Sequence, residues 1–291
     1  MKRFFSVLSV LWSAIALSGC APEPTVGFTL WQLPSQADDH GSSYVIRTPH
    51  GRVIAIDGGK APEADYLRGF LGALGNEVDV WIVTHPHGDH VGAMTELLND
   101  RQGLTVRSVW QSRFTPEMIA SESSLRAEAY YAAIDSADDA EVVECRAGDE
   151  FTIDGVHFKI LSQVNPEIDV NVYNNSSMAF RVWDDTKSVV FLGDLGIEGG
   201  DKLLGSEFRP DLDCDYLQMS HHGQAGCSEH FYKSINFRAC LWSTATWLYD
   251  NNKHGQGIGT GPWKSLETRR WMREKGITEH YVSCDGLYRI E

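Results

Sequence analysis

One stretch of sequence decides the fold: the apolar run Val78-Asp79-Val80-Trp81-Ile82-Val83, followed directly by Thr84-His85-Pro86-His87-Gly88-Asp89-His90. The β-branched and aromatic residues of the run predict a buried strand. His85 and His87 lie two positions apart after it and can point to one side, while Gly88 permits a tight turn that aims Asp89 and His90 at a second position. Neutral imidazole and carboxylate oxygen are the ligands that divalent first-row metals prefer. A lone histidine is usually a packed core residue, but so dense a group predicts a loop that serves one or two metal ions.

Extended segments alternate with helical ones on both sides of this stretch. Periodicity and turn residues predict strands at 29–33, 43–48 and 53–56, a strand pair within 151–161, a hairpin of 178–183 and 188–192, and a strand at 216–219. The helical spacing of apolar residues predicts helices at 63–74 and 123–133. The chain has no low-complexity block and no repeat of fixed period. This pattern predicts an α/β or α+β fold in a single domain.

Composition and charge narrow the classes of function. The chain has 291 residues, 42% of them hydrophobic, with 25 Lys plus Arg against 40 Asp plus Glu and a formal net charge of −15. This composition excludes a disordered chain and suffices for one large domain. A net negative field repels polyanions, so long nucleic acid is disfavoured as a partner.

The first residues read as a targeting segment. Residues 1–19 combine a basic start with an apolar run and small residues, as in a signal peptide, and Leu17-Ser18-Gly19-Cys20 resembles the bacterial lipoprotein signal. By that resemblance Cys20 is lipidated and becomes the first mature residue, which implies an extracytoplasmic protein held at a membrane surface. Plain secretion is the alternative. Residues 20–26 then form a tether, and residues 27–291 form the folded domain. The pairing of the remaining cysteines stays open, since no CxxC pair occurs among them: Cys145, Cys214, Cys227, Cys240 and Cys284.

The histidine-rich loop resembles the metallo-β-lactamase superfamily, whose signature is HxHxDH after a strand. His85, His87, Asp89 and His90 match that signature position by position. The resemblance implies an α+β fold, an αββα sandwich. It also implies that Asp194, in a Gly-Asp turn after an apolar strand, bridges two metals, and that Asp57 supports the site without ligating.

Later motifs resemble one branch of that superfamily, which contains the hydrolase domain of DNA-uptake competence proteins and the phosphorylcholine esterases. Ser220-His221-His222-Gly223 is similar to the last metal-ligand motif of the branch. By this likeness His221 is the expected ligand and His222 an outer or substrate-binding group. The wider superfamily has a third histidine where this chain has residues 174–177, so the His85/His87 position is expected to be the weaker one unless Asn175 or a water completes it.

The resemblance implies metal-assisted hydrolysis. A divalent metal lowers the pKa of a bound water from 15.7 to about 7, which supplies hydroxide at neutral pH. Asp89 is expected to orient it, and His222 or His254 to bind the substrate or protonate the leaving oxygen. Aromatic residues near His254 either line a pocket for a choline-like cation or pack in the core: Trp242, Trp247, Tyr249 and Trp263.

The leading hypothesis is a surface-anchored, metal-dependent hydrolase of a phosphodiester or related ester, with a small-molecule or cell-envelope substrate. The expected cofactor is one or two divalent ions, with Zn first and Mn or Fe as alternatives. Two other hypotheses remain: a β-lactamase-like amide hydrolase, against which the missing third histidine argues, and a non-catalytic binding lipoprotein that contains metal. The natural substrate and the oligomeric state are left open.

Overall fold

The computed structural model describes residues 26–122 and 125–291. The expectations for the signal peptide, for Cys20 and for all of the tether but Val26 therefore lie outside the described residues. Within the described part of the chain, no helix combines the length and the apolar character that crossing a bilayer requires.

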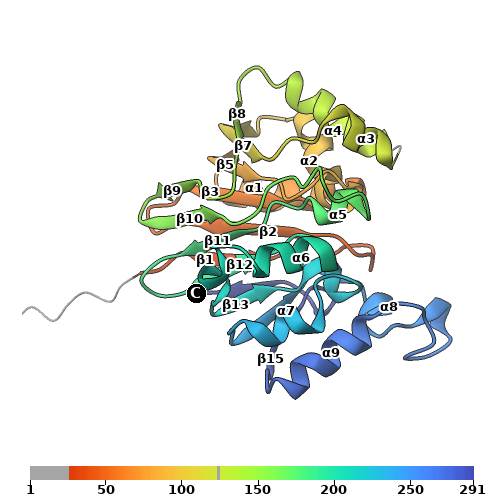
Figure 1. The fold of residues 1–291 in the computed structure, drawn as a ribbon. Coiled ribbons are helices and arrows are strands. Elements are labelled where there is room, and N and C mark those ends of the chain that lie inside the picture. Colours follow the sequence, from red (N-terminus) through yellow and green to blue (C-terminus); the bar gives the residue numbers. More distant parts are fainter. Residues whose placement is uncertain (1–25, 123–124) are drawn as a thin grey trace, which may run out of the picture.

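Two mixed sheets of seven strands each lie face to face, with helices on both outer sides (Figure 1). The first sheet runs in the order β16 (Tyr288–Ile290), β1 (Thr29–Gln32), β2 (Ser43–Arg47), β3 (Val53–Asp57), β5 (Val80–Ile82), β7 (Ser108–Gln111) and β8 (Glu141–Glu144). The second runs in the order β15 (Glu279–Val282), β14 (Ala239–Trp242), β13 (Tyr216–Gln218), β12 (Ser188–Phe191), β11 (Phe180–Trp183), β10 (Val156–Ile160) and β9 (Glu150–Ile153). A small parallel pair, β4 (Glu77–Val78) and β6 (Thr105–Val106), stands apart. This is the αββα sandwich that the family resemblance implied.

The helices divide between the two outer faces. The first sheet is covered by α1 (Ala64–Ala73), α2 (Gly88–Asn99), α3 (Pro116–Ser121), α4 (Leu125–Asp135) and α5 (Val172–Asn175), whose apolar residues share one core cluster with it. The second is covered by α6 (Ile197–Leu204), α7 (Glu229–Ser234) and α9 (Ser265–Glu274). The remaining helical segments are α8 (Thr246–Tyr249), η1 (Ala61–Glu63), η2 (Arg209–Leu212), η3 (Ser220–Gly223), η4 (Lys253–Gly255) and η5 (Ser283–Asp285).

Besides the two cores between each sheet and its helices, a third apolar core lies between the two sheets. The alternation of side chains along a strand explains how one strand contributes to two of these cores. In β3, Val53 and Ala55 face the helices, while Ile54 and Ile56 face the second sheet. Successive side chains of a strand point to opposite faces, so a strand covered on both sides is apolar throughout. This is why the central strands read as continuous apolar runs.

Mixed topology brings the polar loops to one edge. β3, β5, β7 and β8 pair in parallel in the first sheet, as do β12, β13, β14 and β15 in the second. Ligand sites in open sheets with parallel strands form outside the carboxyl ends of those strands. The histidine loop follows β5, Asp194 follows β12 and η3 follows β13, so all three emerge at that edge.

One predicted strand is divided. The run 78–83 forms β4 and β5, separated at Asp79, whose Oδ2 accepts a hydrogen bond from the Val53 amide at 2.9 Å. The predicted hairpin forms from β11 and β12 in antiparallel register, and the strand pair within 151–161 forms from β9 and β10.

Candidate metal centre

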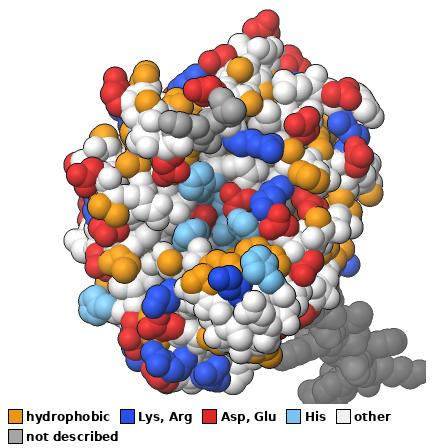
Figure 2. Space-filling model, turned by 90° about the vertical axis from the view of Figure 1, so that its right-hand side faces the viewer, with side chains coloured by type: hydrophobic (Ala, Val, Ile, Leu, Met, Phe, Trp, Pro, Cys, Tyr) orange, Lys and Arg blue, Asp and Glu red, His pale blue; other side chains and the backbone are white. Residues whose placement is uncertain are grey.

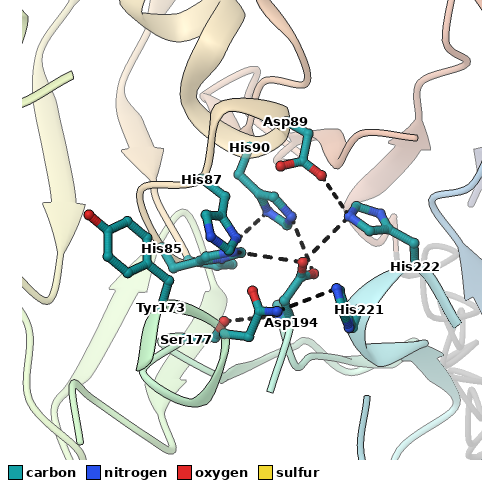
Figure 3. A network of polar contacts seen from close by, with 12 residues as sticks. His85, His87, Asp89, His90, Tyr173, Ser177, Asp194, His221 and His222 are labelled. Carbon is teal, nitrogen blue, oxygen red and sulfur yellow. Dashed lines mark hydrogen bonds and ion pairs between the residues drawn. The ribbon is translucent and has the colours of Figure 1, made fainter. Parts of the chain in front are cut away.

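The site is built from three strand ends and the start of one helix (Figure 3). The loop after β5 carries His85 and His87, and α2 begins at Gly88, so Asp89 and His90 lie in its first turn. Asp194 follows β12 and is 1% exposed. Residues separated by more than one hundred positions in the sequence thus converge on one carboxylate.

Four side chains form the first group close enough to hold a metal ion: Asp89, His90, Asp194 and His222. Their ligand atoms all lie within 4.8 Å of one another. His222 Nε2 is 2.9 Å from Asp89 Oδ2 and 3.4 Å from Asp194 Oδ2. His90 Nε2 is 3.2 Å from Asp194 Oδ1.

A second group shares the same carboxylate and consists of His85, His87 and Asp194. His85 Nε2 is 3.7 Å from Asp194 Oδ2, and 3.0 Å from His87 Nδ1. Asp194 therefore stands between two sets of imidazoles, as the sequence analysis expected of a bridging residue.

Neighbouring residues orient these imidazoles by engaging the ring nitrogen that points away from the centre. His90 Nδ1 lies 2.7 Å from Asp57 Oδ2, His222 Nδ1 lies 2.6 Å from the Ser243 carbonyl, and His87 Nε2 lies 2.9 Å from Glu122 Oε2. Metal-ligating histidines in proteins are held in this way, which fixes the tautomer and the ring orientation. The position of Asp57 behind His90 agrees with the supporting role expected for it.

Burial and mutual charge set the protonation of the centre. Burial raises the pKa of Asp194, but His90 and His222 outweigh it and hold that pKa well below the ordinary value. Burial likewise lowers the pKa of His222, yet Asp194 and Asp89 raise it to about 10. The pKa of His85 lies well below its ordinary value because of burial and the nearby His90. His85 is therefore neutral at pH 7 and has a lone pair for a cation.

The donor set fits a divalent metal. His90 Nε2 and Asp194 Oδ1 are both buried without a hydrogen-bond partner among the described residues, although they lie 3.2 Å apart. A buried polar atom without a partner is rare and calls for a specific explanation. A cation placed between an imidazole nitrogen and a carboxylate oxygen satisfies both atoms.

The two adjacent histidines of η3 lie otherwise than their expected roles require. It is His222 that joins the first group, whereas His221 belongs to neither. His221 Nε2 faces the side-chain amides of Asn174 at 3.3 Å and Gln224 at 3.2 Å. Both histidines adopt left-handed backbone conformations, with φ of 50° and 56°, and this turn sends their rings in different directions. The assignment of His221 as the ligand, made from a motif alone, does not agree with this geometry.

Asn175 and His254 also lie elsewhere than expected. The Asn175 amide bonds the Val170 carbonyl, Glu198 and the Gly199 amide, so it holds the chain together and does not face the centre. His254 is exposed in η4 and lines a cavity of about 290 Å³ together with Trp247 and Trp263. Neither group of possible metal ligands includes it.

An open cleft of about 280 Å³ leads to the centre and is lined by His40, His87, Asp89, Asp194, His221, His222, Gln224, Trp247, Leu248 and Trp263. Figure 2 shows histidines gathered around carboxylates in a hollow of this face, with an apolar patch beside them.

Sequence reasoning missed His40, whose Nε2 lies 3.4 Å from Asp89 Oδ2. Burial and the nearby His222 lower the pKa of His40 to about 4. Its one signal in the sequence is a polar Asp-Asp-His-Gly segment before a strand. Nothing in the sequence marks Glu122 as part of this site, because it lies at the end of α3 and not in the histidine loop.

Comparisons with known proteins agree with this architecture. Residues 37–226 match the family model described as the metallo-beta-lactamase superfamily. The metallo-beta-lactamase fold protein YhfI from Bacillus subtilis is 13% identical over 91% of this chain and 100% of its own, with a TM-score of 0.57. CmlA, a diiron beta-hydroxylase from Streptomyces venezuelae, is 14% identical over 92% of this chain and 55% of its own, with a TM-score of 0.55. Such identities show a shared fold alone. The comparison with curated proteins found no match.

Proposed function

The chain belongs to the metallo-beta-lactamase superfamily, and from that premise we propose that it is a metal-dependent hydrolase of phosphodiester or related ester bonds. Members of this superfamily are generally hydrolases. One observation carries the proposal: two groups of imidazoles share the buried carboxylate of Asp194 at the end of an open cleft. A purely structural metal site is closed by protein ligands, whereas a catalytic one stays accessible to substrate.

Asp89, His90, Asp194 and His222 would hold one ion, and His85, His87 and Asp194 a second. A divalent metal at this position would lower the pKa of a bound water to about 7 and so supply the nucleophile at neutral pH. Zn, Mn and Fe all accept these ligands. The diiron centre of CmlA, which shares the fold, supports including iron among the metals to be tested.

The side chains that line the cleft supply substrate contacts. Asp89 Oδ2 lies between His222 and His40, and these two imidazoles fix the carboxylate at the point where it orients the nucleophile. His40, His221 and Gln224 line the same cleft and offer hydrogen bonds to substrate oxygens. The Ser243 carbonyl holds His222 Nδ1, and His222 Nε2 points at the carboxylates of Asp89 and Asp194, an arrangement that suits a metal ligand better than an acid for the leaving group.

Charge and cleft shape favour a small substrate. The net charge of −15 disfavours long nucleic acid, and the cleft has the volume of a small-molecule site. Trp247 and Trp263 form one wall, with ring centroids 4.7 Å apart, and offer an apolar surface to the group carried by the ester. These features support a phosphorylcholine-type or similar cell-envelope ester.

A metal-resolved activity screen tests the proposal. Metal-free enzyme is reloaded with Zn²⁺, Mn²⁺ or Fe²⁺ and assayed on bis(p-nitrophenyl) phosphate, p-nitrophenyl phosphorylcholine and nitrocefin. Asp194→Ala and His90→Ala should lose at least about 100-fold in kcat/KM, whereas the exposed Asp185→Ala, a matched control, should keep the wild-type value. Equal activity of wild type and both site variants refutes the proposal. Rapid nitrocefin turnover alone identifies an amide hydrolase, and metal binding without any turnover identifies a binding protein.

Anchoring at a membrane surface is the second part of the proposal, and the lipoprotein-like Leu-Ser-Gly-Cys sequence supports it. Cys20→Ser should move the protein from the membrane fraction to the soluble extracytoplasmic fraction and abolish labelling by a radioactive fatty acid. If the wild-type protein takes up no fatty-acid label, the lipid anchor is disproved while the hydrolase proposal stands.

A further inference from the structure

The two groups of the metal centre are unequal. The first contains four residues with ligand atoms, whereas the group of His85, His87 and Asp194 contains three. Divalent ions in protein sites have at least four ligands, of which a water supplies one in many catalytic sites. The inference that follows concerns the fourth protein ligand of this second group, and it rests on the proposed function.

Residues 173–178 run alongside the second group, and their first part is tied to His87. The Tyr173 amide donates to Glu122 Oε1 at 3.2 Å, while Glu122 Oε2 holds His87 Nε2 at 2.9 Å. The Tyr173 ring stacks on the His87 ring, with centroids 5.0 Å apart and planes 25° apart. One carboxylate thus positions both the ligand His87 and the backbone that precedes Asn174.

The last part of the segment is tied to the other two members of the group. Ser177 Oγ accepts a hydrogen bond from the Asp194 amide at 2.9 Å, and the Met178 amide donates to the Thr84 carbonyl at 2.8 Å, next to His85. Figure 3 shows Tyr173 on the side of His85 and His87, and Ser177 beside Asp194. Asn174 lies between these two contacts and is 3% exposed.

Contacts of the Asn174 amide leave one atom without a partner. Its Nδ2 donates to Asn171 Oδ1 at 3.1 Å and faces His221 Nε2 at 3.3 Å. In this assignment Asn171 Oδ1 and His221 Nε2 both face the Nδ2 end of the Asn174 amide, and neither faces its Oδ1 end. Asn174 Oδ1 is then buried with no hydrogen-bond partner among the described residues. The neighbouring Asn175 differs, since its Oδ1 accepts from the Gly199 amide and its Nδ2 has two acceptors.

We propose that Asn174 Oδ1 is the fourth protein ligand of the His85–His87–Asp194 site. An amide oxygen is a harder ligand than an imidazole, and oxygen ligands shift preference toward Mn²⁺ and away from softer ions. The second site therefore binds its ion more weakly than the first and is more tolerant of Mn²⁺ relative to Zn²⁺ than a site with three imidazoles.

Metal binding, measured without substrate, tests this assignment. Metal-free full-length protein is titrated with Mn²⁺, and bound ions are counted by elemental analysis after dialysis. Electron paramagnetic resonance distinguishes an isolated Mn²⁺ from a coupled pair. Wild type should bind two ions and show the coupled spectrum. Asn174→Leu keeps the size of the side chain but removes the oxygen, and it should weaken the second ion at least about tenfold and abolish coupling.

Two further variants and a control separate ligation from packing. Asn174→Asp restores an oxygen ligand and should keep the second ion and the coupled spectrum. Asn174→His should raise the preference of the second site for Zn²⁺ over Mn²⁺. Asn76→Gly is the matched control: it replaces another asparagine in a left-handed backbone conformation, with φ of 59°, lies outside the Asn174 network and should bind both ions as wild type does.

The outcomes distinguish this inference from the proposed function. No bound metal in wild type refutes the proposed function itself. If wild type and Asn174→Leu both bind two ions with equal affinities, the role of Asn174 is overturned and the proposed function is left intact. A wild type that binds only one ion has the same consequence. If Asn174→Leu does not fold, Asn174→Asp decides: a retained coupled pair supports the ligand, and a lost second ion overturns it.

Discussion

At the residue scale, the centre depends on side chains that would not touch a metal. Asp57 is 1% exposed and contacts His90 Nδ1, while its other oxygen accepts from the Thr84 amide at 2.9 Å. One carboxylate thus holds both a ligand and the loop that precedes it. Outer residues of this kind contribute strongly to metal affinity, because they set the direction of the ligand lone pair.

Replacing Asp57 tests this directly. Asp57→Asn should lower the affinity for the first ion about 10–100-fold, because the amide can no longer hold His90 in the ligating tautomer. Competition with a chromophoric chelator measures the change. Asp79→Asn is the control, since Asp79 also binds a backbone amide at a strand end but lies away from the centre. Equal affinities in the two variants would contradict the role given to Asp57.

Protons compete with metal for the same atoms. Burial lowers the pKa of His90, but the carboxylates of Asp194 and Asp57 raise it well above the ordinary value, and the pKa of His222 rises to about 10. Both imidazoles are therefore protonated on both ring nitrogens at pH 7, and a metal ion must displace one proton from each.

Metal binding at pH 7 should accordingly release about two protons, and affinity should rise with pH between about 6 and 8. Isothermal calorimetry in buffers of different ionisation enthalpy measures the release. The stability of the metal-free protein should change with pH in the opposite direction. Protonated His222 contributes fully to the free energy of unfolding below its unfolded pKa of about 6.5. This contribution is lost as the pH rises toward the folded pKa of about 10. Heats of binding that do not depend on the buffer would disprove the proton release.

The residues show where sequence reasoning succeeds. The dense loop at 85–90 and the Gly-Asp turn at Asp194 are local patterns, and the structure brings them together. The choice between His221 and His222 depends on two left-handed residues, which a motif does not reveal. His40, Glu122 and Asn174 come from three separate segments, a loop, the end of α3 and the helix α5, and only the packed fold brings them near the centre.

At the element scale, η3 places His222 through one close approach. Gly223 has φ of 81°, and a Cβ built there would lie 2.3 Å from Cζ3 of the buried Trp242. This helical turn can therefore lie against β14 only with a glycine at that position.

Gly223→Ala should destabilise the protein by about 2–4 kcal/mol, since it combines overpacking with a left-handed alanine. It should also displace His222 and weaken the first ion. Gly255→Ala, with φ of 76° and no atom within 4 Å of the added carbon, should cost about 1 kcal/mol. Urea unfolding compares the two variants. Equal losses would mean that the contact with Trp242 is unimportant.

Strand patterns were the most predictable elements. β1, β2, β3, β10 and β11 lie within a few residues of the predicted strands, because buried strands in a sandwich are long apolar runs bounded by turn residues. The division of the predicted strand 78–83 into β4 and β5 at Asp79 was missed. The Asp79 carboxylate binds the amide at the start of β3, and one such residue leaves the apolar pattern of the run unchanged. The order of strands in the sheets depends on contacts between distant segments and could be inferred only through family resemblance.

At the scale of the whole molecule, the centre lies between the two halves of the sandwich. The first half contributes residues 85–90, and the second contributes Asp194 and His222. An ion bound by both halves stabilises the folded state alone, because the unfolded chain does not bring these residues together.

Removal of metal should therefore lower thermal stability. An ion at 100 times its Kd adds about 2.7 kcal/mol, which corresponds to a rise in Tm of roughly 5 °C for a chain of this size. Calorimetry with and without a chelator measures the shift. Asp194→Ala should show no difference between the two conditions, and an unchanged Tm in wild type would count against a metal that links the halves.

The pairing of β1 with β16 has a consequence for the rim of the first sheet. Leu30 is in register with Ile290, so the edge of the first sheet is the product of the first and the last strands. On its other side β1 pairs only with β2, so β16 covers backbone groups of β1 that would otherwise lie open at the rim of the sheet. Loss of residues 288–290 would leave β1 as a bare edge strand, and a bare edge is a template on which another chain can add a strand.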